Sequence, residues 1–404
     1  MKRLHLFEGI GIELEYMIVD AKTLKVLPLT EELIFQETED YSVEVDHGAI
    51  GWSNELVAHV IELKTNGPAD SLAGLQQLFH KEVQYINQKL KVNNAMLLPT
   101  ASHPFFVPEK ETIIWPHEYN EVYALYDRIF NCKGHGWSNL QSMHINFPFA
   151  NDEEFAPLHA AIRMILPLLP ALAASSPIIE GKVTGKMDTR LDYYQQNQKL
   201  IPIIAGMVIP EAVYSKAEYE TRIFNPIAEA IAPYDEDRVL DKHFLNSRGA
   251  IARFDRGAIE IRILDLQECP MADLAIAEIV CESIKWLIEK FKDEMHLLKD
   301  GCSTTQLWAI LQGTIEFGNQ ALITDEIYTE MIGLEGAVDA NAVWKHLLNE
   351  TRTKLSDEAQ NALDYIIQNG NLSERILKAH QKSKQSIEEI YHSLADCLNK
   401  NRQF

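Results

Sequence analysis

Three short apolar segments, far apart in the chain, each carry two polar residues separated by one position. The pairs are Glu13 and Glu15 in GIELEY, His144 and Asn146 in SMHINF, and Glu260 and Arg262 in AIEIRI. Side chains alternate between the two faces of a β-strand, so each pair lies on one face and the apolar residues on the other. If these strands share a sheet, their carboxylates and imidazole gather on one surface. Gathered carboxylates repel one another unless a cation lies among them, so the pattern predicts a metal site.

A fourth segment, ELVAHVIELKT at residues 55–65, is predicted to be a strand and adds Glu62, with Glu55 at its start. Such an oxygen-rich set with one imidazole suits Mg²⁺ or Mn²⁺, whereas Zn²⁺ prefers a Cys/His set that the pattern lacks. The alternative for any single pair is an antiparallel sheet with one solvated face, which alternates in the same way. The recurrence of ligand-type residues in four segments favours the metal site.

The net charge and composition of the chain argue against two classes of binding partner. The 404-residue chain carries a formal net charge of −22, which nucleic acid or an anionic membrane surface would repel. We therefore expect small-molecule substrates and neither of those partners. The longest apolar run, residues 164–174, is broken by Pro167 and Pro170 and is too short to span a bilayer. Five cysteines without CxxC spacing, and an N-terminus without a signal-like apolar run, predict a cytoplasmic protein.

The polar pairs imply a β-sheet, and the rest of the sequence predicts the strands of that sheet and the helices around it. Alternation predicts strands at residues 4–20, 41–45, 55–65, 95–101, 138–147, 248–253 and 258–264. Helical spacing predicts helices after a cap at Asp70 and Ser71, at residues 118–130, from Asp152 to Pro167, from Met271 onward, and at 357–368 and 372–398. Residues 175–194 read as a long loop, and the last hundred residues show no strand signal. The expected architecture is an α+β domain over residues 1–300, with a helical C-terminal layer over residues 301–404 packed on it.

Six motifs, taken in their order along the chain, resemble those of a known family. They are GIELEY, ELVAHVIELKT, SHPF at residues 102–105, MHINFP, SSPIIEGKVTGKMDTR and IEIRILDLQECP. The order resembles the glutamate–cysteine ligase superfamily, and most closely its family 2, the bacterial carboxylate–amine ligase branch. The resemblance runs from about residue 8 to about residue 290. It implies a glutamine synthetase-like fold, in which helices back a curved and mostly antiparallel sheet.

The resemblance also implies roles for nine residues. Ligands of Mg²⁺, or Mn²⁺, would be Glu13, Glu15, Glu55, Glu62, His144 and Glu260, with Glu13 and Glu260 on the side of ATP and Glu55 and Glu62 nearest the amino-acid substrate. Arg190 and Arg262 would face the transferring phosphoryl group and the substrate carboxylate, and Asn146 would line the same cleft. Arginine suits both partners, because its planar fork binds oxygens in pairs.

The implied activity is an ATP-dependent ligation. The γ-carboxylate of L-glutamate would be activated as an acyl phosphate and joined to an amine, with L-cysteine as the first candidate. Three alternatives stay open: the same activation with another amine, phosphoryl transfer to a guanidine, and a non-catalytic relative that binds metal or nucleotide. No GxxxxGK[ST] and no complete GxGxxG occurs, which argues against a P-loop or Rossmann nucleotide site. The sequence leaves open whether the chain forms a homo-oligomer.

Overall fold

A single eight-stranded sheet organises the protein. The structure, a computed structural model, describes residues 3–39 and 44–404. The sheet consists of β1 (Gly11–Asp20), β2 (Glu44–His47), β3 (Ile50–Asn54), β4 (Val60–Thr65), β5 (Ala95–Leu98), β6 (Ser142–Pro148), β9 (Ala250–Arg253) and β10 (Ala258–Asp265). Its strand order is β2-β3-β4-β1-β6-β10-β9, and β5 pairs with the second half of β1. All strand pairings of this sheet within the described residues are antiparallel. This confirms the predicted α+β class with a mostly antiparallel sheet.

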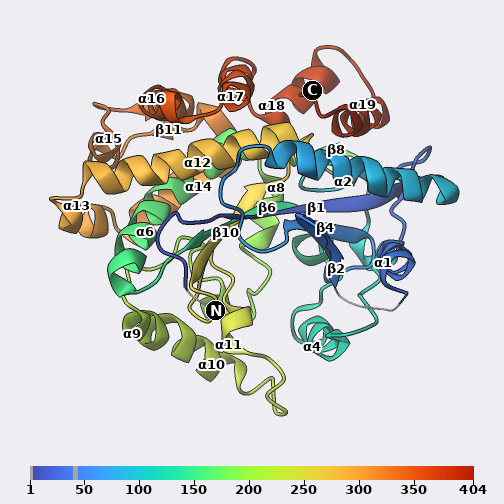
Figure 1. Ribbon diagram of the computed structural model, residues 1–404, viewed down its shortest axis with the longest axis horizontal. Helices are drawn as coiled ribbons and strands as arrows, with labels where there is room; N and C mark the ends of the chain where they lie inside the picture. The colour runs from blue at the N-terminus through green and yellow to red at the C-terminus, as the bar shows by residue number, and fades with distance from the viewer. Residues whose placement is uncertain (1–2, 40–43) are drawn as a thin grey trace.

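Helices cover both sides of this sheet. In chain order they are α1 (Thr30–Thr38), α2 (Leu75–Leu90), α3 (Pro108–Glu111), α4 (Asn120–Phe130), α5 (His135–Ser138), α6 (Asp152–Ile165), α7 (Leu169–Ala173), α8 (Thr189–Tyr194), α9 (Lys216–Tyr219), α10 (Asn225–Ile231), α11 (Lys242–Leu245), α12 (Pro270–Lys290), α13 (Met295–Asp300), α14 (Thr304–Phe317), α15 (Glu326–Ile332), α16 (Ala340–Thr351), α17 (Asp357–Asn369), α18 (Leu372–Gln381) and α19 (Ile387–Lys400). Figure 1 shows α2 and α12 along one side of the sheet with the C-terminal helices beyond them, and α4 and α9 to α11 on the other side.

The apolar residues of β1 point toward α2 and α12. Ile12, Leu14 and Tyr16 are fully buried and belong to one hydrophobic core with Phe79 of α2 and Ile276 of α12. This core continues into the C-terminal layer, where α14, α16 and α17 add buried Leu, Ile and Trp side chains. The division of the chain at residue 300 into a domain and an outer layer stays a prediction.

Strand pairing brings the polar pairs onto the opposite face. Glu13 lies opposite His144 between β1 and β6, Glu15 lies opposite Glu62 between β1 and β4, and Glu260 lies opposite Asn146 between β10 and β6. Directly opposite residues in an antiparallel pair point to the same side of the sheet. Four strands from distant parts of the sequence therefore present their polar residues on one surface.

Several predicted strand boundaries are wrong. The first strand begins at Gly11 rather than at residue 4, and the predicted strand 55–65 begins at Val60, so that Glu55 lies in the connection after β3. The strand predicted at 41–45 begins outside the described residues, which resume with Glu44 in β2. The C-terminal layer also contains two-residue strands, β11 (Leu322–Ile323) and β12 (Val338–Asp339), although no strand was predicted there.

Helix starts and ends were predicted less well than helix positions. Neither Asp70 nor Ser71 caps α2, because Gly74 precedes the helix with a φ of +79° and supplies the left-handed turn into Leu75. The predicted helix 372–398 is two helices, since Ser386 and Glu389 form a capping box that begins α19. The expected loop at 175–194 contains β7 (Ile178–Ile179), β8 (Lys182–Val183) and α8, so Arg190 lies on a helix.

One helical stretch, Asp152–Ala173, is long and apolar enough by length and composition to cross a membrane. It consists of α6, the 3₁₀ turn Leu166–Leu168 and α7, and it continues past Pro167 and Pro170. In its most apolar window, 94% of the residues are buried inside the protein. Its hydrophobicity is accounted for by a place in the core.

Candidate active site

A cleft of about 370 Å³ opens on the polar face of the sheet. Its lining includes six predicted ligand residues, Glu13, Glu15, Glu55, Glu62, His144 and Glu260, and five cationic residues, Lys64, Arg190, Arg253, Arg256 and Arg262. Asn146 is not among these lining residues; its Nδ2 donates to Glu13 Oε1 at 2.9 Å. The structure therefore brings eight of the nine predicted site residues to one cleft, with the ninth in contact with one of them.

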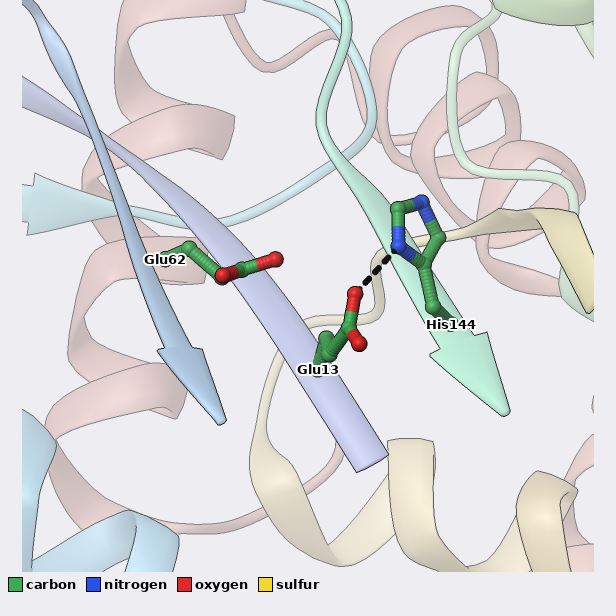
Figure 2. A group of neighbouring side chains, drawn as sticks. All are labelled: Glu13, Glu62 and His144. Atoms are coloured by element: carbon green, nitrogen blue, oxygen red, sulfur yellow. Dashed lines mark hydrogen bonds and ion pairs between the residues drawn. The ribbon is translucent and has the colours of Figure 1, made fainter. Parts of the chain in front are cut away.

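Two groups of ligand-type atoms share Glu62. One group is Glu13, Glu62 and His144, and the other is Glu15, Glu55 and Glu62; within each, one ligand atom per residue lies within 4.8 Å of the others. Figure 2 shows the first group, whose side chains come from β1, β4 and β6 and converge on one space. This geometry suits two neighbouring cations that share one carboxylate.

His144 lies among three carboxylates. Its Nδ1 is 2.7 Å from Glu13 Oε2 and 3.9 Å from Glu260 Oε1, and its Nε2 is 3.6 Å from Glu15 Oε1. Burial lowers the pKa of His144, but the three carboxylates outweigh burial and raise this pKa to about 9. Burial alone would raise the pKa of Glu13, but the hydrogen bond and the charge of His144 lower this pKa to about 2. A charged imidazole thus balances part of the carboxylate charge.

At Glu55 and Glu62, burial and like charge outweigh the neighbouring cations. Burial, and then the charge of Glu15, raise the pKa of Glu55 to about 8. Burial, Glu13 and Glu55 raise the pKa of Glu62 well above its ordinary value, although the Ser53 hydroxyl donates a short hydrogen bond to it. The group is therefore short of positive charge, and a divalent cation among these oxygens would relieve the repulsion.

The two predicted arginines reach the cleft from different elements. Arg262 of β10 donates from Nη2 and Nε to the same oxygen of Glu260, at 2.7 and 3.0 Å. Arg190 of α8 is 1% exposed, and its Nε donates to Asp265 Oδ1 at 2.6 Å. Both side chains line the cleft, so a bound anion would meet two cationic groups held by separate elements.

Three further cationic residues of the cleft were missed from the sequence. Lys64 follows Glu62 by two positions on β4, and its Nζ lies 3.5 Å from Glu62 Oε2 and 2.9 Å from Glu44 Oε1. The same two-residue spacing that identified the other pairs would have identified Lys64. Arg253 ends β9, within a strand that alternation predicted, whereas Arg256 lies in the turn to β10, where two-residue spacing does not apply.

Four aromatic side chains, together called the aromatic wall, line the same cleft. Tyr123 and Tyr126 of α4, Trp137 of α5 and Tyr194 of α8 line the cleft. The rings of Tyr126 and Trp137 pack with their centroids 5.5 Å apart. Such a wall keeps water from part of the cleft and strengthens the electrostatic interactions inside it.

Solved structures with this architecture define the class of fold. A bifunctional glutathione synthetase from Pasteurella multocida aligns with a TM-score of 0.63 and 12% identity, over 98% of this chain and 53% of that one. A glutamate–cysteine ligase from Francisella tularensis, solved in complex with AMP, aligns with a TM-score of 0.58 and 13% identity, over 99% of this chain and 89% of that one. The fold is that of the glutamine synthetase-like ligases, as the sequence predicted.

The family follows from the sequence comparison. The model of glutamate–cysteine ligase family 2 (GCS2) matches residues 9–393, and the chain belongs to that family. An uncharacterized protein of Archaeoglobus fulgidus is 31% identical over 399 residues, 98% of this chain and all of that one. A relative from Corynebacterium glutamicum is 23% identical over 190 residues, 46% of each chain, so that match spans about half of the relative's length.

Proposed function

We propose that this protein is an ATP- and Mg²⁺-dependent carboxylate–amine ligase that activates the γ-carboxylate of L-glutamate, with L-cysteine as the first candidate amine. One observation carries the proposal. Two carboxylate-rich groups that share Glu62 lie in the same cleft as two arginines from separate elements. An ATP-dependent ligase needs this combination, because it must hold a polyphosphate and a carboxylate, both anionic, within bonding distance of each other.

The donor set fits magnesium or manganese. Five carboxylates and one imidazole are hard or borderline ligands, and the raised pKa values of Glu55 and Glu62 indicate a group short of positive charge. Glu13, Glu62 and His144 would hold one ion, and Glu15, Glu55 and Glu62 a second, with Glu260 beside the first. Bound Mg²⁺ would neutralise the charge of the ATP phosphates. Binding would require neutral His144, so uptake of the metal would release a proton.

The arginines and the sheet orient the reacting groups. A γ-carboxylate oxygen of glutamate attacks the γ-phosphorus of ATP, the bond from that phosphorus to the bridging oxygen breaks, and ADP leaves. Arg190 of α8 and Arg262 of β10 bind the equatorial phosphoryl oxygens or the substrate carboxylate. The amine nitrogen then attacks the acyl carbon, phosphate leaves, and the nitrogen loses a proton to solvent. The aromatic wall limits access of water to the acyl phosphate.

The test measures nucleotide and product together. Purified protein with Mg²⁺, ATP and L-glutamate is assayed for ADP, phosphate and amide, with and without L-cysteine and a panel of other amino acids. We expect equal amounts of ADP, phosphate and amide when the correct amine is present. A guanidino kinase would form ADP and a phosphoguanidine without free phosphate, and a non-catalytic relative would bind ATP without turnover. Either result would overturn the proposal.

A further inference from the structure

Asp265, the last residue of β10, lies outside the carboxylate groups but contacts Arg190 directly. It is fully buried and uses both carboxylate oxygens. Oδ1 accepts from Arg190 Nε at 2.6 Å, and Oδ2 accepts from the Ser175 backbone N–H at 2.8 Å and the Ser176 hydroxyl at 2.9 Å. A buried carboxylate is costly unless donors surround it, so this arrangement holds Arg190 Nε in one place.

The backbone of Arg190 is attached to the same frame. Its N–H donates to Ser176 Oγ at 3.0 Å, so Ser176 links the main chain of Arg190 to Asp265. Asp188, fully buried, caps α8 by accepting from the Leu191 N–H at 2.8 Å. Burial and the neighbouring Asp265 raise the pKa of Asp188 well above its ordinary value, which favours the neutral form of Asp188.

Two helices of the C-terminal layer, α14 and α18, form hydrogen bonds with the segment that precedes α8. The N–H groups of Met187 and Asp188 both donate to the carbonyl of Ile315 in α14, at 3.1 Å. Ser373 of α18 donates from its hydroxyl to the Met187 carbonyl at 2.5 Å. The segment that leads into α8 is thus fixed on both sides, and a rigid support of this kind is what a precisely aimed arginine requires.

This frame leaves the far end of Arg190 available. Arg190 lines the cleft although it is 1% exposed, and within residues 3–39 and 44–404 its buried Nη2 has no hydrogen-bond acceptor. We propose that Asp265 is a positioning residue: it holds Nε so that the distal N–H groups of Arg190 face the cleft and bind an anionic group of the ligand. The identity of that group, the phosphates of ATP, rests on the proposed function.

A double-mutant cycle on Mg·ATP binding, measured by calorimetry on the full chain, tests this role. Asp265→Asn keeps the shape of the side chain and removes its charge, and we expect Kd for Mg·ATP to rise about 10-fold, as for the loss of a charged hydrogen bond. Arg190→Ala should raise Kd at least as much. The double variant should bind no more weakly than Arg190→Ala alone, because Asp265 acts through Arg190. If Asp265→Asn does not fold, Ser176→Ala decides, with an expected rise of about 3-fold.

Glu268→Gln is the matched control. Glu268 follows Asp265 by three residues in the sequence. It is also fully buried and also paired with an arginine, Arg375 of α18. This variant should lower Tm and leave the Mg·ATP affinity unchanged. The role assigned to Asp265 is wrong if Asp265→Asn, or Ser176→Ala in its place, binds Mg·ATP like wild type, or if the effects add in the double variant. Folded wild-type protein that binds no Mg·ATP would instead overturn the proposed function and, with it, the ligand named here.

Discussion

The two faces of β1 carry opposite kinds of residue in alternate positions. Ile12, Leu14 and Tyr16 are fully buried in the apolar core, where burial contributes free energy of folding. Glu13 and Glu15 point the other way, into a cleft where the pKa of neighbouring Glu62 is raised by burial and by like charge. One face of the strand stabilises the fold, and the other lines a cleft in which the buried charge of Glu62 costs stability. Costly charges that converge on a cleft indicate a binding role.

The largest effect should follow from removing a carboxylate charge on the polar face of the sheet. We expect Glu62→Gln to lower ligase turnover by on the order of 10²-fold or more, because it removes the carboxylate common to both ligand groups. The same change should leave Tm unchanged or higher, since it removes repulsion from Glu13 and Glu55. Initial rates at saturating Mg·ATP and a thermal melt measure both effects. Wild-type turnover in Glu13→Gln, Glu62→Gln and Glu260→Gln alike would exclude the metal-site interpretation.

The arginine of the polar face gives the next effect. Arg262→Lys keeps the charge but loses the planar fork that now contacts Glu260. We expect kcat/KM to fall roughly 10-fold to 10³-fold, which corresponds to about 1.4–4 kcal/mol of transition-state stabilisation. Steady-state kinetics with varied ATP and glutamate provide the measurement. Intact kinetics with a lower Tm would assign Arg262 to a structural ion pair.

The apolar face of the same strand should respond in the opposite sense. Leu14→Ala, one position from Glu13, creates a cavity in the core and should lower the free energy of unfolding by about 2–5 kcal/mol. Because Leu14 points away from the cleft, KM for ATP in the folded fraction should stay within a factor of about two, as for sites without shared partners. Urea unfolding and kinetics on one preparation make the comparison. A change in KM as large as that of Arg262→Lys would show that the two faces are coupled.

A smaller effect concerns pH and a core histidine remote from the cleft. His159 of α6 is fully buried, and burial and then Arg163 lower its pKa from 6.5 to about 3. The folded state thus keeps His159 neutral, and this contribution to stability is present above pH 6.5 and is lost as pH falls toward 3. Between pH 7 and pH 5, wild type should lose about 2 kcal/mol more unfolding free energy than His159→Leu. Equal losses in urea unfolding at the two pH values would show that His159 does not titrate in this way.

The same alternation explains how much the sequence could predict. Where a strand pairs regularly, as at Glu13–Glu15 and His144–Asn146, two-residue spacing determines the face, and pairing then places these residues together. The pairing of β10 with β6 shifts register after Ile261, yet Glu260 and Arg262 both line the cleft. Helical spacing also located α2, α4, α6, α12 and α17 to α19, but it gave no boundaries for most of the other helices. The GCS2 motifs supplied the roles, and those roles stay predictions.

Periodicity failed where the chain departs from regular structure. Glu55 reaches the cleft from the connection after β3, because the chain turns at Ala58 and His59 before β4 begins. Arg190 lies on a six-residue helix that Asp188 caps, too short for a helical period to show in the sequence. The start of α2 depends on the positive φ of Gly74, which outweighed the capping potential of Asp70 and Ser71. Such local conformations depend on tertiary contacts, and composition does not reveal them.

The central claim, that the polar face of the sheet activates a carboxylate with ATP, has one direct measurement. Purified protein is incubated with Mg²⁺, ATP and L-glutamate labelled with ¹⁸O in its γ-carboxylate, with L-cysteine or another stimulating amino acid, and the released phosphate is analysed by mass spectrometry. Attack of the carboxylate on the γ-phosphorus predicts that one ¹⁸O atom passes into each phosphate, in step with ADP and amide. ADP release with unlabelled phosphate, or no amine-dependent ADP release with any amino acid, would contradict the account.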